Sequence, residues 1–135
     1  MEAIRIRDAA ALLGVSDDTI RRWVASGVLD ATTSDSGVMT VDGAQLATVA
    51  RDRAGDQPDD GSGVLRSARN NFPGLVTEVI IDGVMAQVSM QCGPFEVTSL
   101  MSAQSARELG LQPGSVATAV VKATTVIVET KRERS

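Results

Sequence analysis

The chain has 135 residues, of which 43% are hydrophobic and 22% are charged, a balance typical of one medium globular domain or two small ones. Seventeen acidic residues against 13 Lys and Arg give a net charge of −4, which excludes a generally basic protein that coats nucleic acid. The sequence has no His and one cysteine, Cys92. This composition excludes His-based catalysis and a His or multi-Cys metal cage within one chain, so we expect no enzyme.

The same composition bears on the cellular compartment. A lone thiol cannot form an intramolecular disulfide, which favours a reducing interior. The first residues lack a basic segment followed by an apolar one, and no apolar run approaches the ~20 residues of a membrane span. We therefore expect a cytoplasmic protein that has no membrane partner.

A change of composition divides the chain near its middle. Residues 55–65 are mainly Gly, Pro, Asp and Ser, which is typical of a flexible linker. Apolar residues recur at helical spacing before this segment and alternate after it. We predict a first domain at 1–54, the linker at 55–65, a second domain at 66–130 and a polar tail at 131–135. Six Arg and 11 acids give residues 1–65 a charge of −5, whereas seven basic and six acidic residues give the remainder +1.

Three short helices are predicted in the first domain. The first covers residues 8–13 and ends at Gly14, whose freedom at positive φ suits a tight turn. Ser16 caps the second helix, which carries an apolar stripe that includes Trp23, interpreted as a core residue. A hairpin-like loop then leads to Asp42, which caps the third helix.

Two strings in this domain carry a resemblance. Leu-Leu-Gly-Val-Ser at 12–16, followed by Thr-Ile-Arg-Arg-Trp at 19–23, resembles the winged helix-turn-helix of MerR and excisionase-type DNA-binding proteins. The resemblance implies that the second helix enters the major groove of DNA. It implies DNA contacts by Ser16, Thr19, Arg21 and Arg22. For the two arginines, the alternative is an ordinary solvated helix face. Residues 33–40, at the wing, contain one acid and no base, unlike the basic wings frequent in that family.

The second domain is predicted to be mainly β. Alternating apolar residues and an Asp82–Gly83 turn predict a hairpin. The expected strands are 75–81, 84–90, 95–100, 115–121 and 125–128. A short helix capped by Ser102 is expected to run to Leu109 and end at Gly110. Five strands and one helix predict an OB-like closed barrel, which makes the whole chain a two-domain α+β protein.

Polar residues near the predicted strand ends share one chemistry: all are neutral or positive hydrogen-bond donors. They are Ser67, Arg69, Asn70, Ser102, Ser105, Lys122 and Thr124. Such a set suits a small tetrahedral oxyanion, whereas a cation such as Ca²⁺ or Mg²⁺ requires oxygen acceptors. Asn70 has an alternative role as a cap of the turn into the first strand.

The order of these residues carries a second resemblance. Ser-Ala-Arg-Asn at 67–70, Ser-Ala-Gln-Ser-Ala at 102–106 and Lys-Ala-Thr at 122–124 closely resemble the Mop domain of molbindins, which is of the TOBE class. The resemblance implies that molybdate, and also tungstate, binds at subunit interfaces. It implies contacts from all seven residues above and from the backbone of Ala123.

Together, the two resemblances lead to a functional hypothesis. We expect a molybdate-binding transcriptional regulator that senses the oxyanion through its second domain and binds promoter DNA through its first. The partial site in one Mop unit predicts a homo-oligomer, either a dimer or a hexamer built as a trimer of dimers. The alternative is a molybdate storage or homeostasis protein whose helix-turn-helix no longer binds DNA.

Overall fold

The computed structural model describes residues 3–54, 61–64 and 70–131. The chain divides into two compact units, Met1–Asp56 and Gln57–Ser135. Most of the expected linker, and the tail beyond Lys131, lie outside the described residues. None of the helices in the described ranges is both long and apolar enough to cross a membrane.

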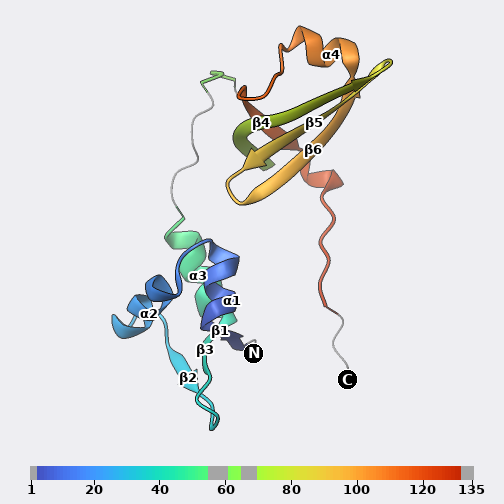
Figure 1. The fold of residues 1–135 in the computed structure, drawn as a ribbon. Coiled ribbons are helices and arrows are strands. Elements are labelled where there is room, and N and C mark those ends of the chain that lie inside the picture. Colours follow the sequence, from blue (N-terminus) through green and yellow to red (C-terminus); the bar gives the residue numbers. More distant parts are fainter. Residues whose placement is uncertain (1–2, 55–60, 65–69, 132–135) are drawn as a thin grey trace. The chain divides into compact units, whose positions relative to one another are not determined.

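The first unit combines three helices with a small sheet (Figure 1). Its elements are β1 (Ala3–Arg5), α1 (Ile6–Leu13), α2 (Asp17–Ala25), β2 (Ala31–Thr33), β3 (Met39–Asp42) and α3 (Gly43–Asp52). The predicted order of helix, turn, helix, hairpin and helix is confirmed. The antiparallel sheet has the order β1-β3-β2, and β1 was not predicted.

Local hydrogen bonds at the helix ends explain why these helices start and stop where they do. Gly14 lies in the left-handed region at φ 69°, and its N–H donates to carbonyl oxygens of α1. The Ser16 hydroxyl accepts the N–H of Thr19 at 3.1 Å, and the Asp42 carboxylate accepts the N–H of Gln45 at 3.3 Å. Both predicted N-caps are therefore confirmed, and each satisfies a backbone donor that the helix cannot.

A single hydrophobic core holds the first unit together. Its buried members are Ile6, Ala9, Ala10, Ile20, Leu29, Val41, Leu46 and Val49. Ile20 on α2 is fully buried, and Trp23 packs half-buried against the same core. The Arg53 guanidinium carbon lies 5.6 Å from the centre of the Trp23 ring, within range of a cation–π interaction. The apolar face of α2 thus points inward and its polar face outward.

The second unit is a four-stranded antiparallel sheet with one short α-helix. Its elements are β4 (Asn70–Asp82), β5 (Met85–Cys92), β6 (Phe95–Ser102), α4 (Ala103–Glu108), β7 (Val116–Val121) and the 3-10 turn η1 (Ala123–Thr125). The strand order is β6-β5-β4-β7, so β6 and β7 are the edges. The predicted hairpin at Asp82–Gly83 is confirmed, with Gly83 at φ 61°.

The expected fifth strand and closed barrel are wrong for the described chain. Residues 125–128 pair with no strand there, and the sheet stops at β7. A turn explains the difference: both the N–H and the hydroxyl of Thr125 donate to the carbonyl of Lys122, at 3.0 and 2.8 Å. These two bonds close η1 where a hairpin to a fifth strand would have to begin.

Strand β4 starts five residues earlier than expected, and Gly74 accounts for its passage through the sheet. A Cβ at this position would collide with the Gln91 carbonyl oxygen and come within 2.8 Å of Cys92 Sγ. Gly74 therefore permits a close approach of β4 and β5 that no other residue type allows. The buried Cys92 thiol in turn donates to the carbonyl of Phe72 at 3.3 Å.

Candidate functional site

The end of β7 presents one group of anion-type donors. Lys122 is the last residue before η1, and its side chain is exposed. Ala123 and Thr124 form the first positions of η1, whose N–H groups have no partner inside so short a turn. An ammonium, two backbone N–H groups and the Thr124 hydroxyl therefore lie on three consecutive residues. This group can surround part of an oxyanion.

Asn70 lies beside this group. It is the first residue of β4 and pairs with Val121, the last residue of β7. Its amide Nδ2 donates to the Val121 carbonyl at 3.2 Å. The side chain thus fastens the end of β7 immediately before Lys122. Within the described residues, the Asn70 amide bonds across the sheet beside the donor group, while the turn of the alternative interpretation would involve residues 65–69, which lie outside them.

A second group of donors lies at the start of α4. The Ser102 hydroxyl accepts the N–H of Ser105 at 3.0 Å, which confirms the predicted cap, and it donates to Ser105 Oγ at 2.8 Å. Because Ser105 Oγ accepts this bond, its own proton remains available for an outside acceptor. Both side chains are exposed. The hydroxyl pair is therefore oriented to donate outward through Ser105.

The two groups belong to opposite ends of β4 in the register of the sheet. Ser102 pairs with Met85, which pairs with Asp82 at the end of β4, whereas Val121 pairs with Asn70 at its start. Within the described ranges, no hydrogen bond joins the Ser102–Ser105 pair to Asn70 or to residues 122–124. Ser67 and Arg69, the other expected contacts, lie outside the described residues.

The chemistry of both groups favours an anion over a cation. Across the part of the chain that is described, no three His, Cys, Asp or Glu side chains gather to hold a metal ion. The donor groups themselves contain one ammonium, three hydroxyls and no acid. Charge-assisted and hydroxyl donors of this kind match the acceptor oxygens of a small oxyanion.

The outward face of α2 carries the residues expected to contact DNA. The hydroxyls of Ser16 and Thr19 lie 3.0 Å apart, and Arg22 Nη2 donates to Thr19 Oγ1 at 3.1 Å. This chain of contacts brings three of the four expected residues together. Arg21 is exposed and makes no ion pair in the described part of the unit. The first turn of α2 also holds Asp17 and Asp18.

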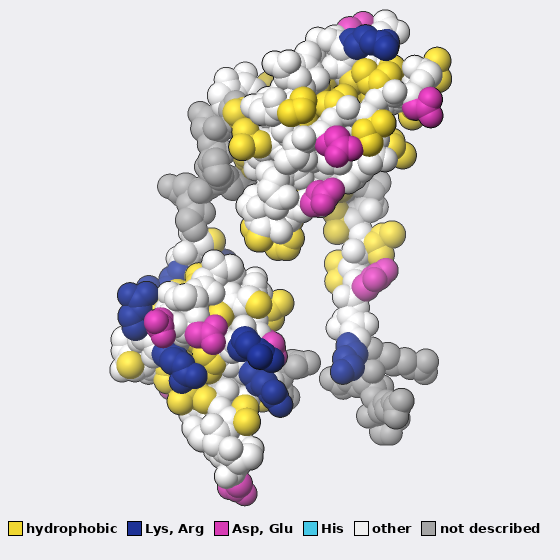
Figure 2. All heavy atoms as spheres, in the orientation of Figure 1, with side chains coloured by type: hydrophobic (Ala, Val, Ile, Leu, Met, Phe, Trp, Pro, Cys, Tyr) yellow, Lys and Arg dark blue, Asp and Glu magenta, His cyan; other side chains and the backbone are white. Residues whose placement is uncertain are grey.

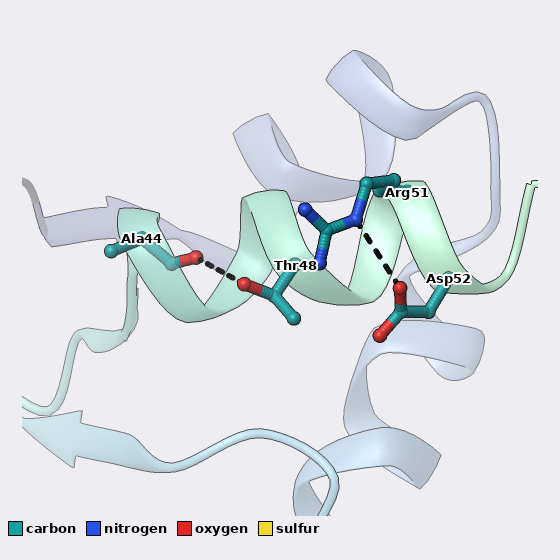
Figure 3. A network of polar contacts seen from close by, with 4 residues as sticks. All are labelled: Ala44, Thr48, Arg51 and Asp52. Atoms are coloured by element: carbon teal, nitrogen blue, oxygen red, sulfur yellow. Dashed lines mark hydrogen bonds and ion pairs between the residues drawn. The ribbon is translucent and has the colours of Figure 1, made fainter.

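In the rest of the first unit, basic residues are mixed with acidic ones. Ser34 bonds to Ser36 across the loop between β2 and β3, and this loop has no basic residue. On α3, Arg51 Nε pairs with its neighbour Asp52 at 3.3 Å, while Thr48 bonds back to the Ala44 carbonyl (Figure 3). Figure 2 shows basic and acidic side chains intermingled on the visible face of this unit.

Sequence reasoning missed one residue that shapes the candidate oxyanion site. Thr125 was expected in a strand, but its two hydrogen bonds to Lys122 close η1 and expose the N–H groups before it. A Thr three residues after a carbonyl acceptor is a known local hydrogen-bonding pattern. Because every residue has a carbonyl three positions earlier, this pattern could not by itself distinguish a turn from a strand in the apolar, β-branched run of residues 125–128.

The sheet, the short helix and the anion-type donors define the second unit as a small ligand-binding domain. The TOBE domain family matches residues 66–128. Molybdenum-pterin-binding proteins 2 and 3 of Clostridium pasteurianum are each 40% identical over 63 residues, which cover 46% of this chain and 93% of each relative. The chain belongs to the TOBE-domain family through its C-terminal unit.

Two solved structures of similar sequence each match about half of the chain, with TM-scores below 0.5. A molybdate-binding protein from Sporomusa ovata is 33% identical, with a TM-score of 0.48, over 50% of this chain and all of that one. MopII from Clostridium pasteurianum is 37% identical, with a TM-score of 0.47, over 49% of this chain and all of that one. The TOBE family match does not include residues 1–65.

Because the sequence relatives are binding proteins, the expectation of a non-enzymatic protein is confirmed.

Proposed function

We propose that the C-terminal unit binds molybdate, and tungstate as a closely similar oxyanion. The observation that carries this proposal is the acid-free donor set at Lys122–Thr124 and Ser102–Ser105. Membership of the TOBE-domain family, with relatives named for molybdenum-pterin and molybdate binding, supports the same ligand class. The Ser105 proton and the Lys122 ammonium supply the charge-assisted bonds.

The proposed site needs more than one subunit. The two donor groups belong to opposite ends of β4 in the register of the sheet and share no hydrogen bond within the described chain. A symmetric assembly can bring the Ser102 end of one copy against the Lys122 end of another. We therefore propose a homo-oligomer, either a dimer or a trimer of dimers, that acts in the cytoplasm.

Calorimetry with molybdate tests the ligand. The wild type should bind, and Lys122→Ala should weaken binding at least about tenfold, because a hydrogen bond to a charged group contributes about 1.5–3 kcal/mol. Lys131→Ala is the matched control, because it removes the same charge from another exposed residue outside the donor set. Absence of heat with the wild type, or equal affinity in both variants, would contradict the proposed site.

The N-terminal unit gives the proposal its second half, which is regulation of transcription. The Ser16–Thr19–Arg22 contacts hold a guanidinium on the exposed face of α2, the helix that the resemblance assigns to the major groove. Regulation also requires that molybdate bind the DNA-competent and incompetent states with different affinity. A gel-shift titration against the protein's own promoter and molybdate-related promoters, with and without molybdate, tests both requirements.

A storage or homeostasis role is the second candidate. Two observations favour it: residues 1–65 carry a charge of −5 and the β2–β3 loop has no base. In addition, the 63 aligned residues cover 93% of the length of the matched relative. That relative is therefore too short to contain a counterpart of the N-terminal unit as well. If no specific DNA complex forms at low salt while molybdate still binds, the storage role replaces the regulator.

A further inference from the structure

The small sheet of the first unit has an inner face and an outer face. The row of paired residues that contacts the core consists of Ile4, Val41 and Ala31. The neighbouring row consists of Arg5, Thr40 and Thr32. Because successive side chains of a strand point to opposite faces, this second row, here called the outer row, lies on the face turned away from the core. Arg5 and Thr32 are exposed, and Thr40 is half-buried.

The outer row presents hydrogen-bond donors that the described chain leaves largely unused. Arg5 occupies the N-cap position of α1, but its side chain makes no capping hydrogen bond. No ion pair joins its guanidinium to an acid in the described ranges, including Asp8 in the first turn of α1. The Thr40 hydroxyl donates to the Thr32 carbonyl at 3.5 Å, which is long for a hydrogen bond. The row therefore has one free positive charge and two hydroxyls.

The acid on the same face of β3 does not cancel this charge. Asp42 lies two residues beyond Thr40, but its carboxylate is directed at the start of α3. Its Oδ2 accepts the N–H of Gln45 at 3.3 Å, and its Oδ1 is buried. Among residues 3–5 and 31–42, the sequence has one base, Arg5. The positive charge of this sheet thus comes from β1 and not from the β2–β3 loop.

The outer row has a fixed position relative to α2. The Trp23 carbonyl accepts the N–H groups of Val28 at 2.9 Å and Leu29 at 3.1 Å, and the Leu29 side chain is fully buried. Strand β2 begins two residues later, at Ala31. Figure 1 shows the β2–β3 hairpin projecting from the unit beside α2. A rigid connection of this kind lets α2 and the sheet contact one large partner together.

The chemistry of the outer row fits the phosphate backbone of a nucleic acid. Arg and Thr side chains are common donors to phosphate oxygens, and such contacts position a protein on the duplex without reading its sequence. Neighbouring strands lie about 4.8 Å apart, so the row extends over about 10 Å. A guanidinium at one end of the row and a hydroxyl at the other match the oxygens of a phosphodiester chain.

We propose that the outer row binds the phosphate backbone of the DNA that α2 contacts. The Arg5 guanidinium neutralises one phosphate, and the Thr32 hydroxyl donates to a phosphate oxygen at the other end of the row. This inference rests on DNA binding by the N-terminal unit, as in the proposed function, and it adds a contact surface outside the helix-turn-helix. The surface exists because β1 joins the sheet.

Salt-dependent titration of the full chain tests the contact. Fluorescence anisotropy is measured with a duplex of the protein's own promoter and with a scrambled duplex of equal length, at about 50 to 200 mM KCl. Arg5→Ala should weaken binding to both duplexes by the same factor, roughly two- to tenfold. It should also reduce the slope of log affinity against log salt by about 0.9, because one phosphate fewer is neutralised. Arg5→Lys should restore the slope, since an ammonium also neutralises a phosphate.

Two further variants separate the hydroxyl and the overall charge from this effect. Thr32→Val should weaken binding to both duplexes roughly two- to tenfold without changing the slope, because a hydroxyl displaces no counterion. Arg51→Ala is the matched control. It removes the same charge near the other end of α3, where Arg51 pairs with Asp52, and should leave affinity and slope close to the wild type. Thermal unfolding checks that each variant remains folded.

Each result decides between distinct readings. An unchanged slope in Arg5→Ala, or an equal change in Arg51→Ala, would overturn the phosphate contact and leave DNA binding in place. A loss confined to the promoter duplex would make Arg5 a base contact and would overturn the proposal as well. If the wild type forms no complex with either duplex at low salt, both the regulator and the outer-row contact are wrong.

Discussion

The hydroxyl of Ser105 offers a clean perturbation of the proposed oxyanion site. Ser105→Ala removes a hydroxyl proton that the described contacts leave free to donate outward. The cap of the helix survives, because Ser102 Oγ accepts the backbone N–H of residue 105, at 3.0 Å in the wild type. The substitution therefore separates ligand binding from folding, which Ser102→Ala cannot do.

The expected magnitudes follow from these contacts. A lost hydrogen bond to a charged ligand weakens binding by about 1.5–3 kcal/mol, or roughly 10- to 150-fold. The position is exposed and Ala is a better helix former than Ser. We therefore expect the free energy of unfolding to change by no more than about 0.5 kcal/mol.

Calorimetric titration with molybdate measures the first quantity, and urea denaturation of the same samples measures the second. Ser102→Thr is the control, because it keeps a hydroxyl at the cap and as a donor to Ser105. Its affinity should remain within a few-fold of the wild type. If Ser105→Ala binds molybdate as tightly as the wild type while remaining folded, the hydroxyl pair does not contact the ligand and this part of the site is wrong.

Three further predictions concern other parts of the chain. Gly74→Ala should destabilise the second unit by about 1–3 kcal/mol, because the Cβ of the new alanine would collide with the backbone of Gln91. Denaturant unfolding measures this, and an unchanged free energy of unfolding would contradict the close approach of β4 and β5. Ile20→Ala should destabilise the first unit by about 2–5 kcal/mol, because Ile20 is fully buried; unfolding followed by Trp23 fluorescence measures this. The molybdate affinity measured by calorimetry should not change. Loss of both stability and molybdate affinity would show that the two units do not fold independently. If α2 binds DNA, Arg22→Ala should weaken the complex and Arg22→Lys should relax its base preference. Fluorescence titration over a set of operator variants measures both. An equal base preference in the wild type and in Arg22→Lys would mean that this arginine contacts no base and at most the phosphate backbone of the DNA.

Features that depend on a few neighbouring residues could be predicted from the sequence. The caps at Ser16, Asp42 and Ser102 each satisfy a backbone N–H three residues later, so the signal and the partner lie on the same short segment. The Asp82–Gly83 hairpin is equally local, because the turn requires a positive φ that Gly83 supplies. The donor set was also found from the sequence, although its contacts with a ligand remain a prediction.

Features that depend on distant segments were missed. The strand was expected to begin at residue 75, yet β4 begins at Asn70, because residues 70–75 pair with β7, a strand near the end of the described chain. The apolar run at residues 125–128 has strand character, but strand formation needs an edge to pair with, and η1 directs the run away from its own sheet. Side-chain pattern alone does not specify whether such an edge is available.

The position of η1 has a consequence for the cost of binding. The backbone is held on both sides of Lys122, by the Asn70 amide at the Val121 carbonyl and by Thr125 at the Lys122 carbonyl. The N–H groups of Ala123 and Thr124 therefore keep one direction before any ligand arrives. An anion that binds there orders little more than the Lys122 side chain, so more of the interaction free energy is retained as affinity.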